Sequence, residues 1–279
     1  IDESVKKNWS TMNSVYTWDD LMESSSSKAD NLNSIIGRLK KMALGWATFG
    51  SEYYNNEQLL NDTIAGLEWF YNYRYNENST WYSKDTDWWY WEIGIPNDLN
   101  DTVVFLYDQL TPSQVTNYMK AVDLWSPTVY YSTIIKDGTE PHPFTGANIV
   151  SKCKVVGLRA ILVKDTAKLQ ESSVGLNDVF QYTTSLDGFY TDGSFIQHVD
   201  HPYAGGSYGT TALSGISEIL WLLAGSTWDN TSDNKAHVYE WVFNTYEPAM
   251  FKGEAFSSVR GRDISRPSSQ ASTGFSIIS

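Results

Sequence analysis

The sequence predicts an all-α protein, an array of helical hairpins that closes into an incomplete (α/α) toroid. Along most of the chain, apolar residues recur at the i, i+3, i+4 spacing of amphipathic helices. The alternation typical of a strand never persists for more than a few residues. Long loops separate successive helical pairs, and in a toroid such loops line a groove. We therefore expect one domain over residues 1–279.

The helical patterns follow one another in order. Residues 33–50 and 57–73 carry the first two, with Ile35, Leu39 and Met42 on one face of the former. A shorter pair covers residues 100–110 and 111–124, and the second opens with Thr111 as an N-cap and Pro112 at the first helical position. The remaining patterns cover residues 146–165, 210–225 and 234–250.

Two segments bear on the extent of the chain. The run "SSSS" at residues 24–27 reads as a local polar loop and not as a linker between domains. The last residues, "STGFSIIS", read as the start of another helix. We therefore expect the sequence to be a piece of a longer protein.

Composition excludes several classes of function. The net charge of −13 argues against a nucleic-acid partner. No run of about 18 apolar residues exists, so we predict no membrane span. The single cysteine, Cys153, lies in an apolar helical pattern and should pack as a small hydrophobe. The N-terminus lacks a signal-peptide pattern, but sequons favour a secreted protein, which we expect to be a monomer. The sequons begin at Asn8, Asn61, Asn78, Asn100 and Asn230.

An aromatic run stands in "DWWYWEIGIPNDLND", residues 87–101. Trp88, Trp89, Tyr90 and Trp91 are consecutive, so they cannot all face one helical core. Either two fill the core and two are half-exposed, or the exposed indoles form a patch on which sugar rings stack. We favour the stacking patch.

Asn148 stands where the loop "PHPFTG" turns into a helix. An asparagine there commonly caps the helix. Alternatively, its amide and the N–H groups of the helix N-terminus are aimed at an anion.

The segment "DGFYTDGSFIQHVDHPYAGGSYG", residues 187–209, interrupts the helical pattern with glycines and carries His198 and Tyr208. A histidine can act as a base near neutral pH, and a tyrosine can donate a proton. His198 and His201 also flank Asp200, which permits a metal site. No further histidine or cysteine stands nearby, so we predict neither a metal nor a cofactor.

Three arginines gather in "VRGRDISR": Arg260, Arg262 and Arg266. In an acidic chain they form a local basic patch. Guanidinium groups bind carboxylates through paired hydrogen bonds, so the patch is suited to an acidic ligand.

With these motifs in this order, the sequence resembles polysaccharide lyase family 8. The motifs are "WWYWEIGIP", "TGAN", "DGFYTDGSFIQH", "YAGGSYG" and "VRGRDISR", and the resemblance covers roughly residues 33–279. It implies an (α/α)-toroid catalytic domain, followed in the family by β-sandwich domains that are absent from this sequence. It implies cleavage of an acidic, uronic-acid-containing polysaccharide by β-elimination, without a cofactor.

The resemblance also implies roles for individual residues. Asn148, His198 and Tyr208 match the family's catalytic asparagine, histidine and tyrosine. Arg262 and Arg266 match its arginines, which contact substrate and support the tyrosine. Trp88 and Trp89 match its aromatic patch.

Two further substrate contacts are predicted, at Phe144 and Tyr203. A Pro143–Phe144 pair is similar to the loop of hyaluronate lyases, whereas the aromatic and "VRGR" segments are similar to those of xanthan lyases. The spacer from His198 to Tyr208 is one residue longer than usual, and an alternative alignment would place Tyr203 at the catalytic position.

Two other classes of function stay open. A toroidal glycoside hydrolase would use two carboxylates about 6.5–9.5 Å apart if it inverts. The candidate carboxylates are Glu92, Asp187, Asp192 and Asp200. The chain could also be a carbohydrate-binding fragment without catalytic activity.

Overall fold

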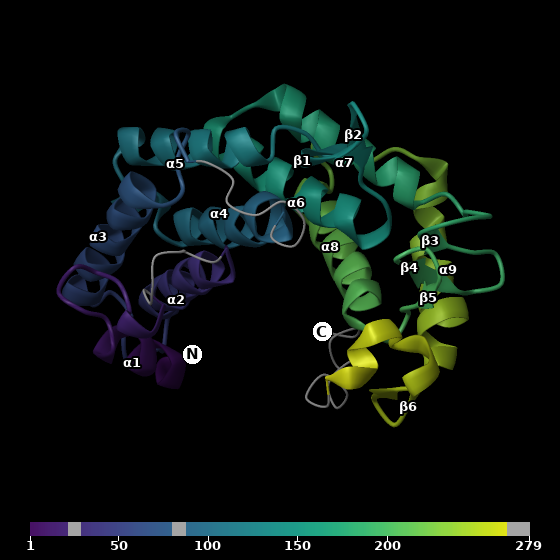
Figure 1. Ribbon diagram of the computed structural model, residues 1–279, viewed down its shortest axis with the longest axis horizontal. Helices are drawn as coiled ribbons and strands as arrows, with labels where there is room; N and C mark the ends of the chain where they lie inside the picture. The colour runs from purple at the N-terminus through teal and green to yellow at the C-terminus, as the bar shows by residue number, and fades with distance from the viewer. Residues whose placement is uncertain (22–28, 80–87, 267–279) are drawn as a thin grey trace. The chain divides into compact units, whose positions relative to one another are not determined.

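The computed structural model describes residues 1–21, 29–79 and 88–266. α-Helices dominate, as the sequence predicts, and the strands are short (Figure 1). The predicted "SSSS" loop and the helix in "STGFSIIS" lie outside the described residues. The chain divides into two compact units. Unit 1 comprises Ile1–Pro127, Ser132–His142 and Leu158–Asp165; unit 2 comprises Thr128–Tyr131, Pro143–Gly157 and Thr166–Ser279.

Unit 1 is a layer of packed helices. Its central helix, α2 (Ala29–Ala47), contacts α1, α3 and α4. The face of α2 predicted from periodicity is buried, with Ile35, Leu39 and Met42 inaccessible or nearly so. The other helices are α1 (Asp2–Ser10), α3 (Glu57–Tyr73), α4 (Ile95–Phe105) and α5 (Pro112–Trp125). The sequence predicted α2, α3 and α5, and the helix expected over residues 100–110 overlaps α4, which begins and ends five residues earlier; α1 was not predicted.

Caps set the starts of two of these helices. The Asn56 side chain accepts a hydrogen bond from the Leu59 N–H group at the start of α3. Thr111 caps α5 in a reciprocal capping box with Gln114. The N-cap predicted at Thr111 is therefore confirmed, and such a cap is worth about 1 kcal/mol.

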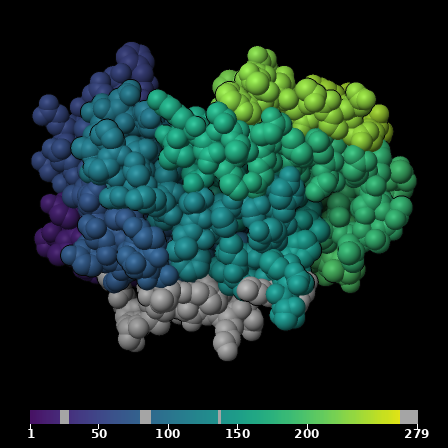
Figure 2. All heavy atoms as spheres, turned by 90° about the horizontal axis from the view of Figure 1, so that it is seen from above, coloured from purple at the N-terminus to yellow at the C-terminus, as the bar shows by residue number. Residues whose placement is uncertain are grey.

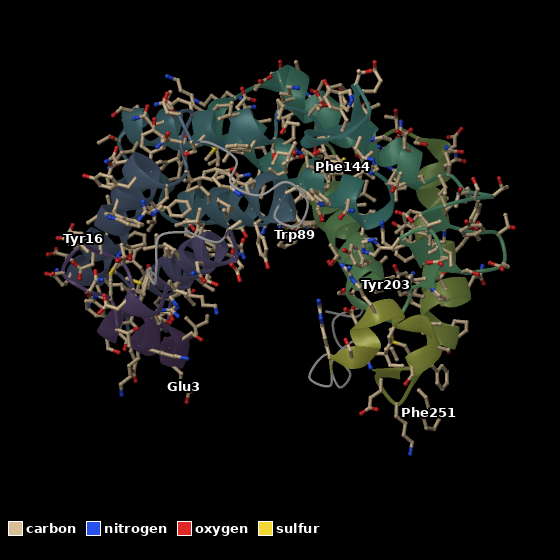
Figure 3. All side chains as sticks on the ribbon, in the orientation of Figure 1. Glu3, Tyr16, Trp89, Phe144, Tyr203 and Phe251 are labelled. Carbon is tan, nitrogen blue, oxygen red and sulfur yellow. The ribbon has the colours of Figure 1, made fainter. Side chains whose placement is uncertain are left out.

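The aromatic run adopts a conformation that the sequence did not predict. Residues Tyr90–Gly94 form a π-helical turn that leads into α4. This turn places Trp91 in the core, 4.5 Å from the Trp125 ring, while Trp89 remains 38% exposed (Figure 3). The prediction that these aromatics cannot share one core is confirmed.

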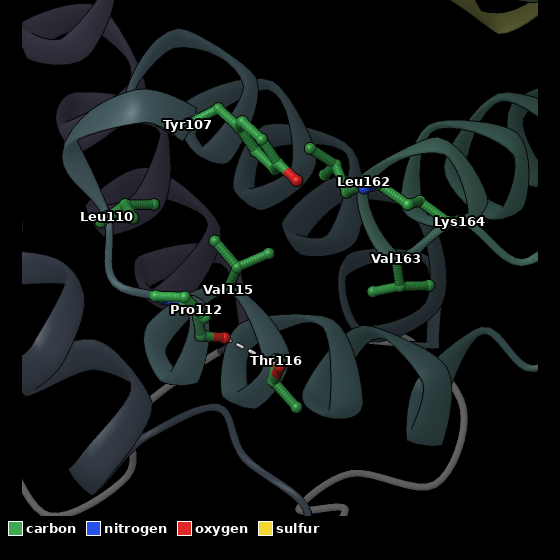
Figure 4. A pocket seen from close by; sticks show the side chains of 8 residues that line it. All are labelled: Tyr107, Leu110, Pro112, Val115, Thr116, Leu162, Val163 and Lys164. Carbon is green, nitrogen blue, oxygen red and sulfur yellow. Dashed lines mark hydrogen bonds between the residues drawn. The ribbon is translucent and has the colours of Figure 1, made fainter.

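Unit 1 also carries an open pocket of about 320 Å³ (Figure 4). Residues from α5, from the segment before it and from the end of α6 (Gly146–Val163) line it, and none of the predicted site residues does. Its lining is Tyr107, Leu110, Pro112, Val115, Thr116, Leu162, Val163 and Lys164.

Unit 2 combines helices with small antiparallel sheets. Its helices are the first part of α6, α7 (Thr166–Val179), α8 (Ser207–Leu223) and α9 (His237–Trp241). A two-stranded sheet pairs β6 (Met250–Phe251) with β7 (Glu254–Ala255). The other two-stranded sheet, β1 (Tyr131–Asp137) with β2 (Glu140–Pro143), belongs almost wholly to unit 1. In the space-filling view, the green and yellow-green atoms of unit 2 form one continuous body (Figure 2).

The glycine-rich segment 187–209, which the sequence predicted as a connection between helices, contains a small sheet and ends in the first turn of α8. Strands β3 (Gly188–Phe189), β4 (Phe195–Gln197) and β5 (His201–Pro202) pair antiparallel in that order. Phe189 of β3 stacks on Trp241 of α9 with ring centroids 3.6 Å apart. This stacking fixes the sheet on the helical core.

The segment predicted as one helix, residues 234–250, is helical as far as Ala249 but changes helix type along its length, beginning with a 3₁₀ turn at Asp233–Ala236. That segment contains α9, a π-helical turn at Val242–Tyr246 and a 3₁₀ turn at Glu247–Ala249. Pro248 has no N–H group to continue an α-helix, and the strand β6 follows at once.

Two other predictions concern single features. Cys153 is fully buried in α6, as expected of a small hydrophobe. Among the described residues no helix has the length and apolarity that a membrane crossing requires. Of the sequon asparagines, Asn8, Asn100 and Asn230 are buried, so in the folded chain they are unavailable for glycosylation.

Candidate active site

Tyr208 and Arg262 form the centre of the candidate site. Tyr208 is the second residue of α8. Arg262 lies in the 3₁₀ helix Gly261–Ser265, and its Nη2 group donates a hydrogen bond to the Tyr208 hydroxyl at 3.0 Å. Tyr208 is half-buried and Arg262 is exposed. A permanent positive charge is thus held against a phenol at the surface of unit 2.

His198 packs against the same phenol ring. The two rings meet edge to face with centroids 4.9 Å apart. The His198 Nε2 atom is buried and has no hydrogen-bond partner among the described residues. A protonated ring would therefore bury a charged N–H group without an acceptor. Burial first, and the charge of Arg262 second, hold the pKa of His198 below its ordinary value of 6.5.

Tyr208 is shifted in the other direction. Burial raises its pKa above the ordinary value of 10.0, although the charge and hydrogen bond of Arg262 oppose the rise. At neutral pH the site therefore holds a neutral imidazole beside a protonated phenol. One group can accept a proton while the other can donate one.

Asn148 is the third residue of α6 and does not cap it. Its own N–H group donates to the Thr145 carbonyl at 3.1 Å, and its side-chain amide makes no hydrogen bond to the described residues. The preceding N–H group, of Ala147, donates to the Gln197 Oε1 atom at 2.9 Å. Asn148 follows Ala147 and His198 follows Gln197, so the hydrogen bond between Ala147 and Gln197 joins the residues that directly precede Asn148 and His198. The structure thereby brings the two into one neighbourhood of unit 2.

The backbone at His198 is strained. His198 and Val199 have φ angles of 57° and 73°, in the left-handed region. Residues other than glycine seldom adopt this backbone conformation, which costs about 1–3 kcal/mol for each residue. The Val199 N–H group donates to the Asp187 Oδ1 atom at 2.7 Å, which helps to hold this turn.

The structure does not favour the predicted substrate contacts of Phe144 and Tyr203. Phe144 is 6% exposed and lies under the Lys152 ammonium group. Tyr203, labelled in Figure 3, is fully buried with its ring edge to face against Tyr208. Its hydroxyl accepts a hydrogen bond from the Arg262 N–H group at 3.1 Å. Both side chains lie where a polymer cannot reach them, so we replace the contact role of Tyr203 by a supporting one. The alternative alignment with Tyr203 at the catalytic position is likewise disfavoured.

The basic patch is smaller than predicted. Arg260 is fully buried, and its Nη2 group donates to the Asp263 carbonyl at 3.0 Å. Arg262 and Arg266 remain exposed. The Arg266 Nη1 atom lies 3.4 Å from the Asp263 Oδ1 atom. The Asp263 Oδ2 atom accepts a hydrogen bond from the Ser207 N–H group at 2.6 Å, which joins this segment to the start of α8.

Gly209 allows the Tyr203 loop to approach α8 closely. A Cβ atom at this position would meet the Tyr203 and Ala204 carbonyl oxygens at 2.4 and 2.5 Å. Neither contact can be relieved by turning a side chain. We expect Gly209→Ala to lower the free energy of unfolding by about 1–3 kcal/mol, measured by urea denaturation.

Gly37 in α2 provides the matched control. A Cβ atom there would meet only the Asp98 Oδ2 atom, at 3.4 Å, an ordinary contact. Alanine is about 0.8–1.0 kcal/mol better than glycine inside a helix, so Gly37→Ala should not destabilise the chain. Equal losses in Gly37→Ala and Gly209→Ala would contradict the packing argument.

The stacking residues Trp88 and Trp89 lie in unit 1. Trp88 is half-buried and Trp89 is exposed, with its ring edge to face against Tyr90 at 5.5 Å. An exposed indole can stack on a sugar ring, so the predicted role stays a prediction.

The buried carboxylate Glu92 has a structural role. It is fully buried in unit 1. Its Oε1 atom accepts hydrogen bonds from the N–H groups of Thr133 and Ile134 at 2.8 and 2.9 Å. A carboxylate that holds the backbone in this way is not available to attack a glycosidic bond.

The carboxylates around the β3–β4–β5 sheet are also occupied. Asp187 accepts three hydrogen bonds. Asp192 accepts from the Ser194 N–H group within its own turn, and Asp200 pairs with His201 at 2.5 Å. Over residues 1–21, 29–79 and 88–266, no three His, Cys, Asp or Glu side chains are grouped so as to hold a metal ion.

Sequence reasoning missed two residues of the site and misjudged a third. Gln197 and Asp263 were not considered, and Asp187 was considered only as a hydrolase carboxylate. The available signal was position: Gln197 precedes His198, and Asp263 follows Arg262.

Comparison with known families identifies the family of the chain. The family model described as polysaccharide lyase family 8, N terminal alpha-helical domain, matches residues 1–278. The chain belongs to polysaccharide lyase family 8. The family predicted from the five motifs is thus confirmed.

Individual relatives agree with the family. This family 8 chain is 38% identical over 258 residues to the xanthan lyase of Bacillus sp. (strain GL1), a match that covers 92% of the chain and 26% of that protein. It is 33% identical over 233 residues to hyaluronate lyase HylB of Cutibacterium acnes, covering 82% of the chain and 28% of the relative. The chain therefore spans about a quarter of the length of these relatives.

A solved structure is similar throughout the chain. The chondroitin AC lyase of Streptomyces coelicolor A3, solved in complex with chondroitin sulphate, matches with a TM-score of 0.88 and 31% identity. The match covers 99% of this family 8 chain and 37% of that one. This likeness confirms the all-α class and is consistent with the predicted toroid of helical hairpins.

Proposed function

We propose that residues 1–279 are the catalytic α-domain of a polysaccharide lyase that cleaves a uronic-acid-containing polymer by β-elimination. Family membership supports this proposal, since the relatives are named for lyase activity on xanthan, hyaluronate and chondroitin. The observation that carries it is the Arg262–Tyr208 hydrogen bond with His198 packed against the phenol ring. These side chains supply the charge and the proton carriers that an elimination requires.

The reaction begins with removal of the C5 proton of a uronic acid. The C–H electron pair forms the C4–C5 double bond, and the C4–O glycosidic bond breaks. The leaving oxygen takes a proton, so no water is consumed. The proton at C5 is very weakly acidic, and its loss places a second negative charge on the carboxylate. That charge has to be stabilised by the enzyme.

Asn148 and Arg262 are suited to this charge. The Asn148 amide makes no hydrogen bond to the described residues and lies in the first turn of α6, where N–H groups favour an anion. Arg262 is exposed and permanently charged. Arg266, beside it, and the indoles of Trp88 and Trp89 would bind the polymer.

His198 and Tyr208 are suited to the proton transfers. The neutral His198 ring accepts the C5 proton, and the protonated Tyr208 hydroxyl donates to the leaving oxygen. In the alternative, a Tyr208 phenolate takes the C5 proton and passes it to the leaving oxygen. This requires Tyr208 to be deprotonated first, although burial raises its pKa. We propose the first assignment.

The dependence of kcat/KM on pH distinguishes the two assignments. If neutral His198 is the acceptor, activity is lost as pH falls through its pKa, which lies below 6.5. Activity persists up to the raised pKa of Tyr208, above 10.0. We therefore expect a plateau across neutral pH with its acidic limb below pH 6.5. A rate that climbs steadily towards pH 10 would instead indicate the phenolate as the base.

We also propose that the protein acts outside the cell as a monomer. Polymers of this kind are too large to cross a membrane, so the enzyme has to meet them where they are deposited. The chain has a net charge of −13, which repels a polyanion. The exposed arginines Arg262 and Arg266 supply local positive charge at the candidate site, where a polyanion can bind.

A further inference from the structure

Three donors from two separate segments of unit 2 converge on one carboxylate, that of Asp187. The Thr145 hydroxyl donates to Asp187 Oδ2 at 2.8 Å, and the Gln197 Nε2 group donates to the same oxygen at 2.6 Å. The Val199 N–H group donates to the other oxygen, Oδ1, at 2.7 Å. Thr145 lies just before Asn148, and the other two donors flank His198. Asp187 is thus bonded to both turns that carry proposed catalytic side chains.

Gln197 adds a second link between the same turns. Its side chain is buried, donating from Nε2 to Asp187 and accepting at Oε1 from the Ala147 N–H group at 2.9 Å. Gly146 makes room for this amide, since a Cβ atom there would lie 2.3 Å from Gln197 Oε1. With one end on a carboxylate and the other on an N–H group, the amide has a single satisfactory orientation.

The backbone on either side of these bonds is strained. His198, Val199 and Leu186 all have φ angles between 57° and 73°. Such turns relax unless surrounding bonds hold them. The hydrogen bond from the Val199 N–H group to Asp187 is one of the bonds that hold the His198 turn.

We propose that Asp187 is a positioning residue for the elimination, because its carboxylate locks the Asn148 turn and the His198 turn in one arrangement. The inference rests on the proposed function. The hydrogen bonds of Asp187 go to Thr145, Gln197 and Val199, and in the described part of the chain none goes to Tyr208. Asp187 acts by fixing how His198 and Asn148 are presented, and a small misplacement of such groups is enough to reduce the rate strongly.

The charge of Asp187 gives this role a distinct signature. His198 is influenced by Arg262 and His201, which lower its pKa, and by Asp187, which raises it; Tyr203 and Tyr208 pack against its ring. Removing the negative charge of Asp187 should therefore lower the pKa of His198 further. The neutral imidazole would then persist to lower pH, and the acidic limb of kcat/KM would move down.

The experiment compares three variants with the parent protein on a uronic-acid polymer. Asp187→Asn should reduce kcat by roughly 10–100-fold with little change in KM, and should move the acidic limb to lower pH. Thr145→Val removes one exposed donor and keeps the carboxylate, so it should reduce kcat less and leave the limb in place. Asp192→Asn is the matched control: it is in the same β3–β4 hairpin, its bonds stay within its own turn, and its activity should be unchanged.

The outcomes separate this inference from the proposed function. If the parent protein releases unsaturated product and Asp187→Asn retains its kcat within about twofold, the positioning role is wrong and the function stands. If kcat falls but the acidic limb of kcat/KM does not move, Asp187 only stabilises the fold, and the positioning role is wrong. If Asp187→Asn does not fold, Thr145→Val decides, and unchanged kcat in that variant overturns the proposal. A parent protein that never forms unsaturated product refutes the function, and the inference with it.

Discussion

Replacing Tyr208 by phenylalanine should abolish product formation while the polymer still binds. Phenylalanine keeps the ring that packs edge to face on His198 at 4.9 Å and against Tyr203 at the same distance. It removes only the hydroxyl that accepts from Arg262 and would protonate the leaving oxygen. A positioned proton donor contributes about 10²–10⁴-fold, so kcat should fall by at least that factor. The measurement is the ultraviolet absorbance of the unsaturated uronide, together with polymer binding.

Tyr182→Phe is the control for Tyr208→Phe. The Tyr182 hydroxyl donates to the Glu240 Oε2 atom at 2.9 Å, so this variant also loses a bonded phenol hydroxyl in unit 2. It should keep the parent activity. Turnover by Tyr208→Phe at a rate similar to that of Tyr182→Phe would end the assignment of Tyr208.

Replacing Arg262 by glutamine should have the second-largest effect. The variant loses the donor to Tyr208 and the positive charge available to the substrate carboxylate. Losing one such stabilising group typically costs about 2.7–4 kcal/mol, or about 10²–10³-fold in kcat. The charge of Arg262 lowers the pKa of both His198 and Tyr208, so both values should rise without it. The acidic limb of kcat/KM should therefore move to higher pH, opposite to the shift expected for Asp187→Asn.

Arg38→Gln controls for the loss of an arginine as such. Arg38 lies on α2 and pairs with Asp20 at 2.5 Å, so this variant also breaks an ion pair. Its rate and pH profile should match those of the parent. An Arg262→Gln variant with a normal acidic limb would show that the guanidinium does not act on the His198 and Tyr208 pair.

The sequence predicted most helices because their apolar periodicity is strong and their caps are local. In α2, the spacing of Ile35, Leu39 and Met42 specifies a buried face without reference to the rest of the chain. Thr111 and Gln114 form a cap from residues three positions apart. In the segment 234–250 the sequence predicted a helix but not its changes of type, because apolar periodicity does not distinguish α-helical from π-helical and 3₁₀ turns.

In the candidate site, too, the sequence predicted what is local in the chain and missed what depends on the folded structure. Asn148, His198, Tyr208 and Arg262 were predicted because they stand in recognisable motifs. The roles of Tyr203 and Phe144 were misjudged because burial is a property of the folded chain: both aromatics lie beneath the surface. Asp187 is 42 residues from Thr145 along the chain, and the two meet only in the folded chain. A motif read by itself offers no sign of such a contact.

Product analysis tests the central claim most directly, that an amide, a guanidinium, an imidazole and a phenol together carry out an elimination. The protein is incubated with uronic-acid polymers, and the fragments are examined by mass spectrometry and ultraviolet absorbance. The account predicts new non-reducing ends that absorb and are lighter by one water molecule than hydrolysis products. Fragments of hydrolytic mass without absorbance, or binding without cleavage of any uronic-acid polymer, would contradict it.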